Sequence, residues 1–162
     1  GAAGWQINLS ALEQIDAWDM QYASDGRSTP NLVPYRITFG NTKSKHVQYP
    51  TTLPTFDELI GIDGADAFGA AQHILTITQS NPNDQVFTLH AELEGQKLLP
   101  AFRELMVGWL QQGHDLVTMG ELHRSWAATG QLDKIATEQF KYGTIANRSG
   151  ELMIQASTAT NF

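Results

Sequence analysis

The chain has 162 residues, of which 41% are hydrophobic and 17% are charged, enough for one globular domain with its own core. Ten basic residues stand against 17 acidic ones, and the formal charge of -7 argues against a nucleic-acid partner, which would require a basic surface. Without cysteine, any metal ligand must be a histidine or a carboxylate. No apolar run approaches the roughly 20 residues that span a bilayer, so we expect the chain itself to be soluble.

Three Ser/Thr-x-x-Glu sequences predict helix starts, because the side chains of such a capping box satisfy the first free amides of a helix. They run from Ser10 to Glu13, from Thr55 to Glu58 and from Thr118 to Glu121. The first helix should end near Asp19 and lead into a strand at 20–24.

A long irregular stretch separates this strand from Thr55. Its glycine and prolines are Pro30, Pro34, Gly40, Pro50 and Pro54. The stretch is too long for an ordinary connection in a compact domain. We therefore expect it to shape a site or to carry additional β structure.

The second half of the chain alternates helices and strands. The predicted elements are a helix from Asp66 to about Thr78, a strand at 86–90, a helix from Lys97 to Gln112 stopped by Gly113, a short buried strand at 115–118, and a last strand at 152–154 after a weaker helix. Such alternation favours parallel strands with helices packed outside them. The fold class is therefore α/β, either an open sheet or part of a barrel.

His90 is the leading candidate for chemistry. It ends the predicted strand at 86–90 and is followed by Glu92 and Glu94. Active-site groups gather after the C-terminal ends of parallel strands, so a histidine there, beside two carboxylates, indicates a general acid or a ligand. A histidine that makes a structural hydrogen bond at a strand end explains the pattern equally well.

Other acidic residues have ordinary structural explanations. Asp25 lies at the end of a different strand and could orient His90 or an arginine, but an Asp-Gly pair more often forms a turn. Asp57 and Glu58 fall in the first turn of a predicted helix, where acidic residues complement the helix dipole. The remaining histidines form no H-x-x-x-H pair, so the sequence contains no self-contained zinc motif.

Four segments carry a resemblance to a known family: AAGW at 2–5, YASDGR at 22–27, PTTLPTFDELIG at 50–61 and TLHAELEG at 88–95. In this order they resemble the formamido-arabinose-phosphoundecaprenol deformylases of bacterial lipid A modification, which are polysaccharide-deacetylase (NodB-like) enzymes. The resemblance covers only the second half of the family's length. It implies a single domain, 1–162, that forms the C-terminal part of a distorted (β/α) deacetylase-type barrel.

The resemblance implies an enzyme that hydrolyses an amide on a lipid-linked amino sugar with the help of a divalent metal ion. In the family the metal ligands and the base lie in the N-terminal half, so we expect this chain alone to bind no metal and to be inactive. His90 should protonate the leaving amine, and Asp25 should be a second catalytic residue. The substrate-binding residues implied are Trp5, Arg27, Asp57, Glu58, Glu92 and Glu94.

The implied partners are an amino sugar on an undecaprenyl-phosphate lipid, the N-terminal half of the barrel, and a membrane surface. This would place the enzyme peripherally at the bacterial inner membrane. Two alternatives stay open. One is a non-catalytic module that binds the sugar-lipid or another partner and lacks the metal site. The other is a self-sufficient α/β enzyme that uses His90 and the carboxylates Asp25, Glu92 and Glu94 with a metal of its own.

Overall fold

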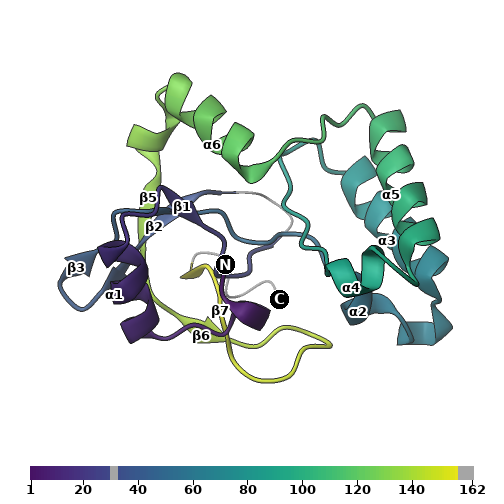
Figure 1. The fold of residues 1–162 in the computed structure, drawn as a ribbon, viewed down its shortest axis with the longest axis horizontal. Helices are drawn as coiled ribbons and strands as arrows, with labels where there is room; N and C mark the ends of the chain where they lie inside the picture. Colours follow the sequence, from purple (N-terminus) through teal and green to yellow (C-terminus); the bar gives the residue numbers. More distant parts are fainter. Residues whose placement is uncertain (30–32, 157–162) are drawn as a thin grey trace.

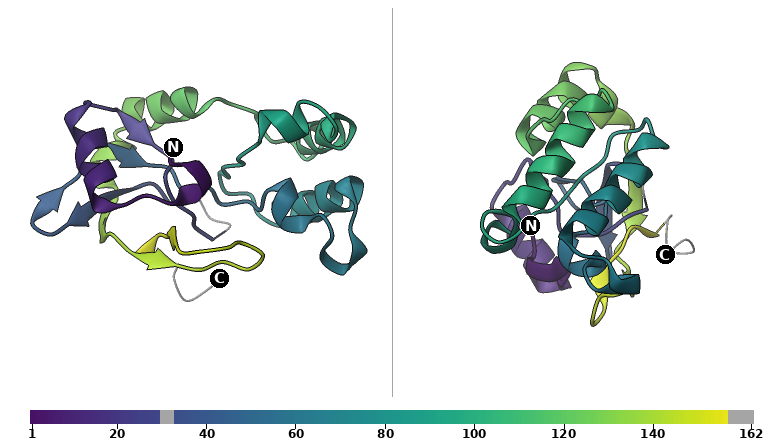
Figure 2. Two further views of the ribbon diagram at one scale, coloured as in Figure 1. Left: turned by 60° about the horizontal axis from the view of Figure 1, so that its bottom comes forward. Right: turned by 90° about the vertical axis from the view of Figure 1, so that its right-hand side faces the viewer.

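The structure, a computed structural model, describes residues 1–29 and 33–156 as a mixed α/β fold. Two parts make up an elongated body (Figure 1). Helices α3 (Ala67–Gln79) and α5 (Leu99–Gln111) pack against each other at one end, and the main β-sheet lies at the other, as the left view of Figure 2 also shows. Among the described residues, no helix is long and apolar enough to cross a membrane.

The main sheet contains both parallel and antiparallel pairs. Its strands are β1 (Tyr22–Ala23), β2 (Tyr35–Phe39), β3 (Thr42–Lys43), β4 (Val47–Gln48) and β5 (Ala136–Gln139). The β1–β4 and β2–β5 pairs are parallel, whereas β2 pairs with β3 and β4 in antiparallel fashion. Strands β6 (Tyr142–Gly143) and β7 (Leu152–Met153) form a separate antiparallel ladder.

The expected parallel sheet is thus only partly correct. The stretch before Thr55 does carry additional β structure, namely β2, β3 and β4, although Pro30 lies outside the described residues. Short connections join these strands, including the turn at Gly40 with its positive φ of 56°, and short connections permit only antiparallel pairing. The described residues form no closed barrel, so the barrel stays a prediction.

The helices are the elements for which the sequence predictions agree best with the structure. The capping box from Thr118 to Glu121 opens α6 (Met119–Ala128), and Thr55 with Glu58 opens the short α2 (Phe56–Leu59). Asp66 caps α3, and α5 ends before Gly113, whose φ is 84°. Two further helical pieces are η2 (Ile62–Gly64) and η3 (Gln131–Lys134).

The predicted capping box from Ser10 to Glu13 is wrong. Helix α1 (Leu9–Ala17) begins earlier, with Asn8 as its N-cap. The Asn8 side chain accepts a hydrogen bond of 2.9 Å from the amide of Ala11. Asparagine is as good a cap as serine, so the earlier residue takes the position.

Two of the predicted strands do not form, although the structure describes both segments. The segment 86–90 is extended, but its backbone pairing is limited to Val86, which bonds to Thr52 and Leu53. The segment 115–118 is exposed rather than buried, with Val117 57% accessible. An apolar run shows only that a segment can be buried, and a strand forms only where a neighbouring strand is there to pair with it.

The largest core cluster lies between the helices and the segments that lead into them. It is built from Leu53, Phe56, Ala70, Ala71, Ile74, Ala101, Leu105 and Trp109. Phe87 packs edge-on against both Phe56 and Trp109, so the extended segment 86–90 is anchored to this core. The position of His90 is therefore fixed by packing on its N-terminal side.

Candidate functional site

His90 lies at the junction between the extended segment and the short helix α4 (Ala91–Glu94), where it is the N-cap residue. Its backbone amide donates a hydrogen bond of 2.7 Å to Oε2 of Glu94. The imidazole is 28% exposed, and its Nδ1 is buried with no hydrogen bond among the described residues. The backbone of His90 is thus fixed, and Nδ1 lies on the buried side of the ring.

Asp57, in the first turn of α2, is the acidic side chain that faces His90. The distance from its Oδ1 to Nδ1 of His90 is 3.8 Å. The Thr55 hydroxyl donates to the same Oδ1 at 2.5 Å, and Nη1 of Arg148 lies 2.8 Å from Oδ2. Partial burial alone would raise the pKa of Asp57, but the Thr55 hydrogen bond and the charges of Arg148 and His90 outweigh it and lower the pKa. Asp57 is therefore held as an anion beside His90.

Glu58, the residue after Asp57 in α2, belongs to a buried ion pair. Arg27 and Glu58 lie 2.6 Å apart with side chains only 5% and 4% exposed. The Arg27 guanidinium also lies 4.5 Å from the centre of the Trp5 ring, and Trp5 belongs to the short helix η1 (Ala3–Trp5). Burial lowers the pKa of Arg27, and Glu58 opposes that shift. An arginine still keeps its charge at neutral pH.

Arg148 is the site residue that the sequence analysis missed. It comes from the connection between β6 and β7, and its guanidinium lies 4.7 Å from the centre of the Trp5 ring. It contacts Asp57, which is 91 positions away in the sequence. A single arginine in an irregular segment carries no pattern that would reveal such a long-range contact.

The structure places Asp25 away from His90. Its carboxylate accepts hydrogen bonds from the amide of Ala2 at 2.7 Å and from the side chain of Gln48 at 2.8 Å. Gln48 in turn contacts the buried His46. Within residues 1–29 and 33–156, no hydrogen bond or ion pair joins Asp25 to His90 or to an arginine. Asp25 thus anchors the segment that leads to Trp5, and its catalytic role stays a prediction.

The two glutamates after His90 differ. Glu94 is fully buried and bonds to the His90 backbone, so it supports the histidine from within the fold. Glu92 is exposed on α4. Trp5, Arg27 and Glu58 are buried as well, and the substrate-binding roles expected for these residues stay predictions.

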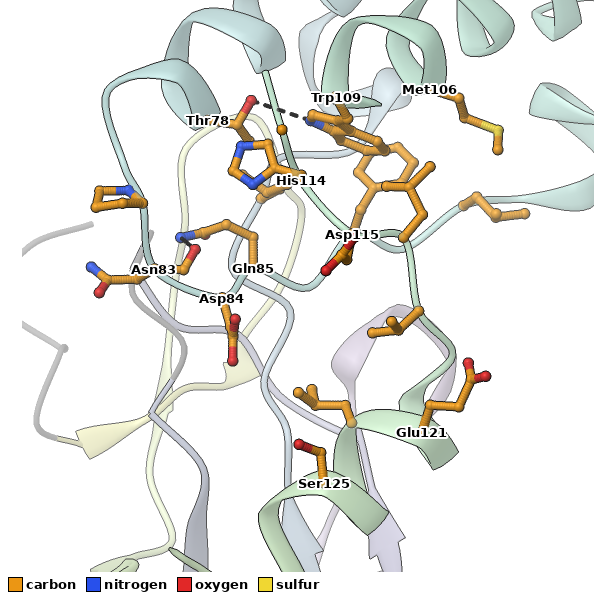
Figure 3. Close-up of a pocket in the computed structure, with 18 of the residues that line it drawn as sticks. Thr78, Asn83, Asp84, Gln85, Met106, Trp109, His114, Asp115, Glu121 and Ser125 are labelled. Atoms are coloured by element: carbon orange, nitrogen blue, oxygen red, sulfur yellow. Dashed lines mark hydrogen bonds between the residues drawn. The ribbon is translucent and has the colours of Figure 1, made fainter. Parts of the chain in front are cut away.

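A cavity of about 900 Å³ lies apart from this site, between α5 and α6 (Figure 3). Phe87 and Leu89 line it, whereas Thr88 and His90 do not. Successive side chains of an extended segment point to opposite sides. Thr88 accordingly bonds to Thr51, and His90 meets Asp57, on the other side of the same segment.

The described residues do not fit a divalent metal ion. In residues 1–29 and 33–156 there is no group of three or more histidines and carboxylates placed to hold one. The carboxylates around His90 already have partners: Asp57 contacts Arg148 and Thr55, Glu58 contacts Arg27, and Oε2 of Glu94 accepts from the His90 amide. These residues therefore make no metal centre, whereas a histidine beside a carboxylate is the kind of pair that can transfer a proton.

Comparison with known proteins gives no matching family model. Two curated proteins with deformylase names are similar to the chain along nearly its whole length. The probable 4-deoxy-4-formamido-L-arabinose-phosphoundecaprenol deformylase ArnD of Shewanella sediminis (strain HAW-EB3) is 32% identical over 156 residues, which are 96% of this chain and 47% of that protein. The protein of the same name from Wigglesworthia glossinidia brevipalpis is 28% identical over 153 residues, 94% of this chain and 50% of that protein.

These matches confirm the resemblance to the formamido-arabinose deformylases. The chain spans about half the length of the curated relatives it matches.

Proposed function

We propose that the chain acts as part of a larger hydrolase that removes the formyl group from the amino group of a lipid-linked sugar. The names of both curated relatives describe a deformylase of this kind. The observation that carries the proposal is the pairing of His90 with the anionic Asp57, which lie in two of the four segments that carry the family resemblance. The segments at 50–61 and 88–95 meet here in space although they are far apart in sequence.

His90 supplies the proton that this reaction needs. When water adds to the formyl carbon and the carbon–nitrogen bond breaks, the nitrogen must take up a proton to leave as an amine. Asp57 faces Nδ1 of His90 and stabilises a protonated ring, which leaves Nε2 to donate to the leaving nitrogen. Glu94 fixes the backbone from which the ring projects.

The other components of the reaction lie outside the described residues in this proposal. The base and the divalent metal ion would be held by the half of the relatives' length that this chain does not match, since no metal ligand set fits here. The substrate would be an amino sugar on an undecaprenyl-phosphate lipid, met at a membrane surface. A non-catalytic module that binds the same sugar-lipid is the alternative.

The test is reconstitution of activity. The chain would be joined to the unmatched half of the Shewanella sediminis relative and supplied with a formamido sugar on a polyprenyl phosphate, with released formate as the readout. His90→Ala should lower turnover by about 10²–10⁴-fold with bound metal and substrate affinity nearly unchanged. His73→Ala, on the exposed face of α3, is the matched control and should be neutral. Near-normal turnover of His90→Ala would end the catalytic assignment, and substrate binding without turnover would favour the alternative.

A further inference from the structure

The side chain of Arg148 is largely buried, although this arginine comes from an irregular connection. Its side chain is only 18% exposed. It is held between the Trp5 ring, 4.7 Å away, and two carboxylates of α2. The Glu58 carboxylate is the more distant, at 3.6 Å, and Oε1 of Glu58 is already paired with Arg27 at 2.6 Å. The nearest carboxylate of Arg148 is therefore that of Asp57.

The two oxygens of Asp57 have different partners. Oδ2 contacts Arg148, whereas Oδ1 accepts from Thr55 and faces His90. A carboxylate is planar, so fixing one oxygen fixes the direction of the other. Without the Arg148 contact, an aspartate that is 37% exposed would be held by the Thr55 hydrogen bond to Oδ1 alone, and the direction of its second oxygen would not be fixed.

We propose that Arg148 is a positioning residue of this site, which holds Asp57 in the orientation that places its Oδ1 against His90. The inference rests on the proposed function for its catalytic meaning, but the geometry can be tested without activity. Three charged groups lie around His90. Asp57 of α2 faces its ring, Glu94 of α4 accepts a hydrogen bond from its backbone amide, and Arg148 contacts the other oxygen of Asp57.

A double-mutant cycle read by NMR tests the proposal on the 162-residue chain. The ¹⁵N chemical shifts of the labelled His90 ring are measured at one fixed pH in the wild type, Asp57→Asn, Arg148→Met and the double variant. In the wild-type background, Asp57→Asn should move the ¹⁵N resonance of Nδ1 of His90, because the anionic carboxylate that faces this nitrogen is replaced by a neutral amide. In the Arg148→Met background the same change should have less than half this effect, because Asp57 no longer faces the ring.

The cycle cancels the direct effect of the Arg148 charge on His90, since only the Asp57-dependent difference is compared. Arg148→Lys keeps the charge and one contact, so it should restore most of the effect. Arg148→Gln, which removes the charge but keeps a polar side chain, takes the place of Arg148→Met if that variant does not fold. Arg103→Met, an exposed arginine on α5, is the control and should leave the full effect. An effect of Asp57→Asn in the Arg148→Met background that is half of the wild-type effect or more, or no effect in either background, would overturn the proposal.

Activity is a separate readout. In the reconstituted enzyme, Arg148→Met should lower kcat by about tenfold with little change in KM, because it acts on proton donation rather than on binding. A positive cycle in an enzyme without deformylase activity would refute the proposed function but keep the Arg148–Asp57–His90 geometry. An active enzyme with no coupling would refute the role of Arg148 alone.

Discussion

The guanidinium of Arg27 lies 2.6 Å from Oε1 of Glu58, across 31 residues of sequence and with both side chains buried. Removal of one partner leaves the other charge in a poorly hydrated place. Arg27→Met should therefore lower the free energy of unfolding by about 3–5 kcal/mol in urea denaturation followed by circular dichroism. The exposed Arg103→Met should change it by less than about 0.5 kcal/mol. A loss below about 1 kcal/mol for Arg27→Met would show that the pair is not structurally important.

Two leucines of α5 offer a matched test of the helical core. Leu105 is fully buried, whereas Leu110 is 58% exposed. Leu105→Ala should cost about 2–5 kcal/mol of unfolding free energy, because it removes buried methyl groups and leaves a cavity beside α3. Leu110→Ala should cost less than about 0.5 kcal/mol. Similar losses in the two variants would mean that α5 packs with a different face.

Asp57 should make stability depend on pH in acid. Burial raises its pKa, but the Thr55 hydrogen bond and the charges of Arg148 and His90 bring the pKa below the ordinary value of 3.8. A lowered pKa means that the stabilising contribution is full above pH 3.8 and is lost as the pH falls through the lower pKa of the folded state. Asp57→Asn should accordingly be less stable than the wild type at pH 6, with the difference shrinking toward pH 2.

Thermal melts at several pH values would measure this difference. Asp63→Asn, an exposed aspartate in η2, is the control and should follow the wild type throughout. A difference between Asp57→Asn and the wild type that stays constant from pH 6 to pH 2 would contradict the ionic contribution.

The isolated chain should bind Zn²⁺, Mn²⁺ or Co²⁺ only weakly. The described residues contain no group of three or more potential ligands at a metal-binding spacing, and a tight site requires such a preformed set. Isothermal calorimetry on the 162-residue chain measures this directly. A tight one-to-one site would instead favour a self-sufficient enzyme with a metal of its own.

Local features of the structure followed from the sequence. The helices α3, α5 and α6 were predicted from apolar spacing together with Asp66, Thr118 and Gly113, because caps and helical periodicity depend on residues within a few positions. The start of α1 was the exception. Asn8 and Ser10 lie close together and both are good N-cap residues, so the local sequence did not show that the helix uses Asn8.

The pairing of strands could not be predicted from the sequence in the same way. The segments 86–90 and 115–118 have the apolar character of strands, yet neither forms a ladder among the described residues. Whether an extended segment becomes a strand depends on the segment that reaches its edge, which can lie anywhere in the chain.

The sequence by itself determined that His90 stands in one of the four segments that carry the family resemblance and that Asp57 lies in the first turn of a helix. Only the tertiary structure decided which carboxylate meets His90. It placed Asp57 there rather than Asp25, and it brought Arg148 from 91 positions away to hold Asp57. Contacts of this kind depend on how separate elements pack, and no local pattern of residue types encodes which distant side chains that packing brings together.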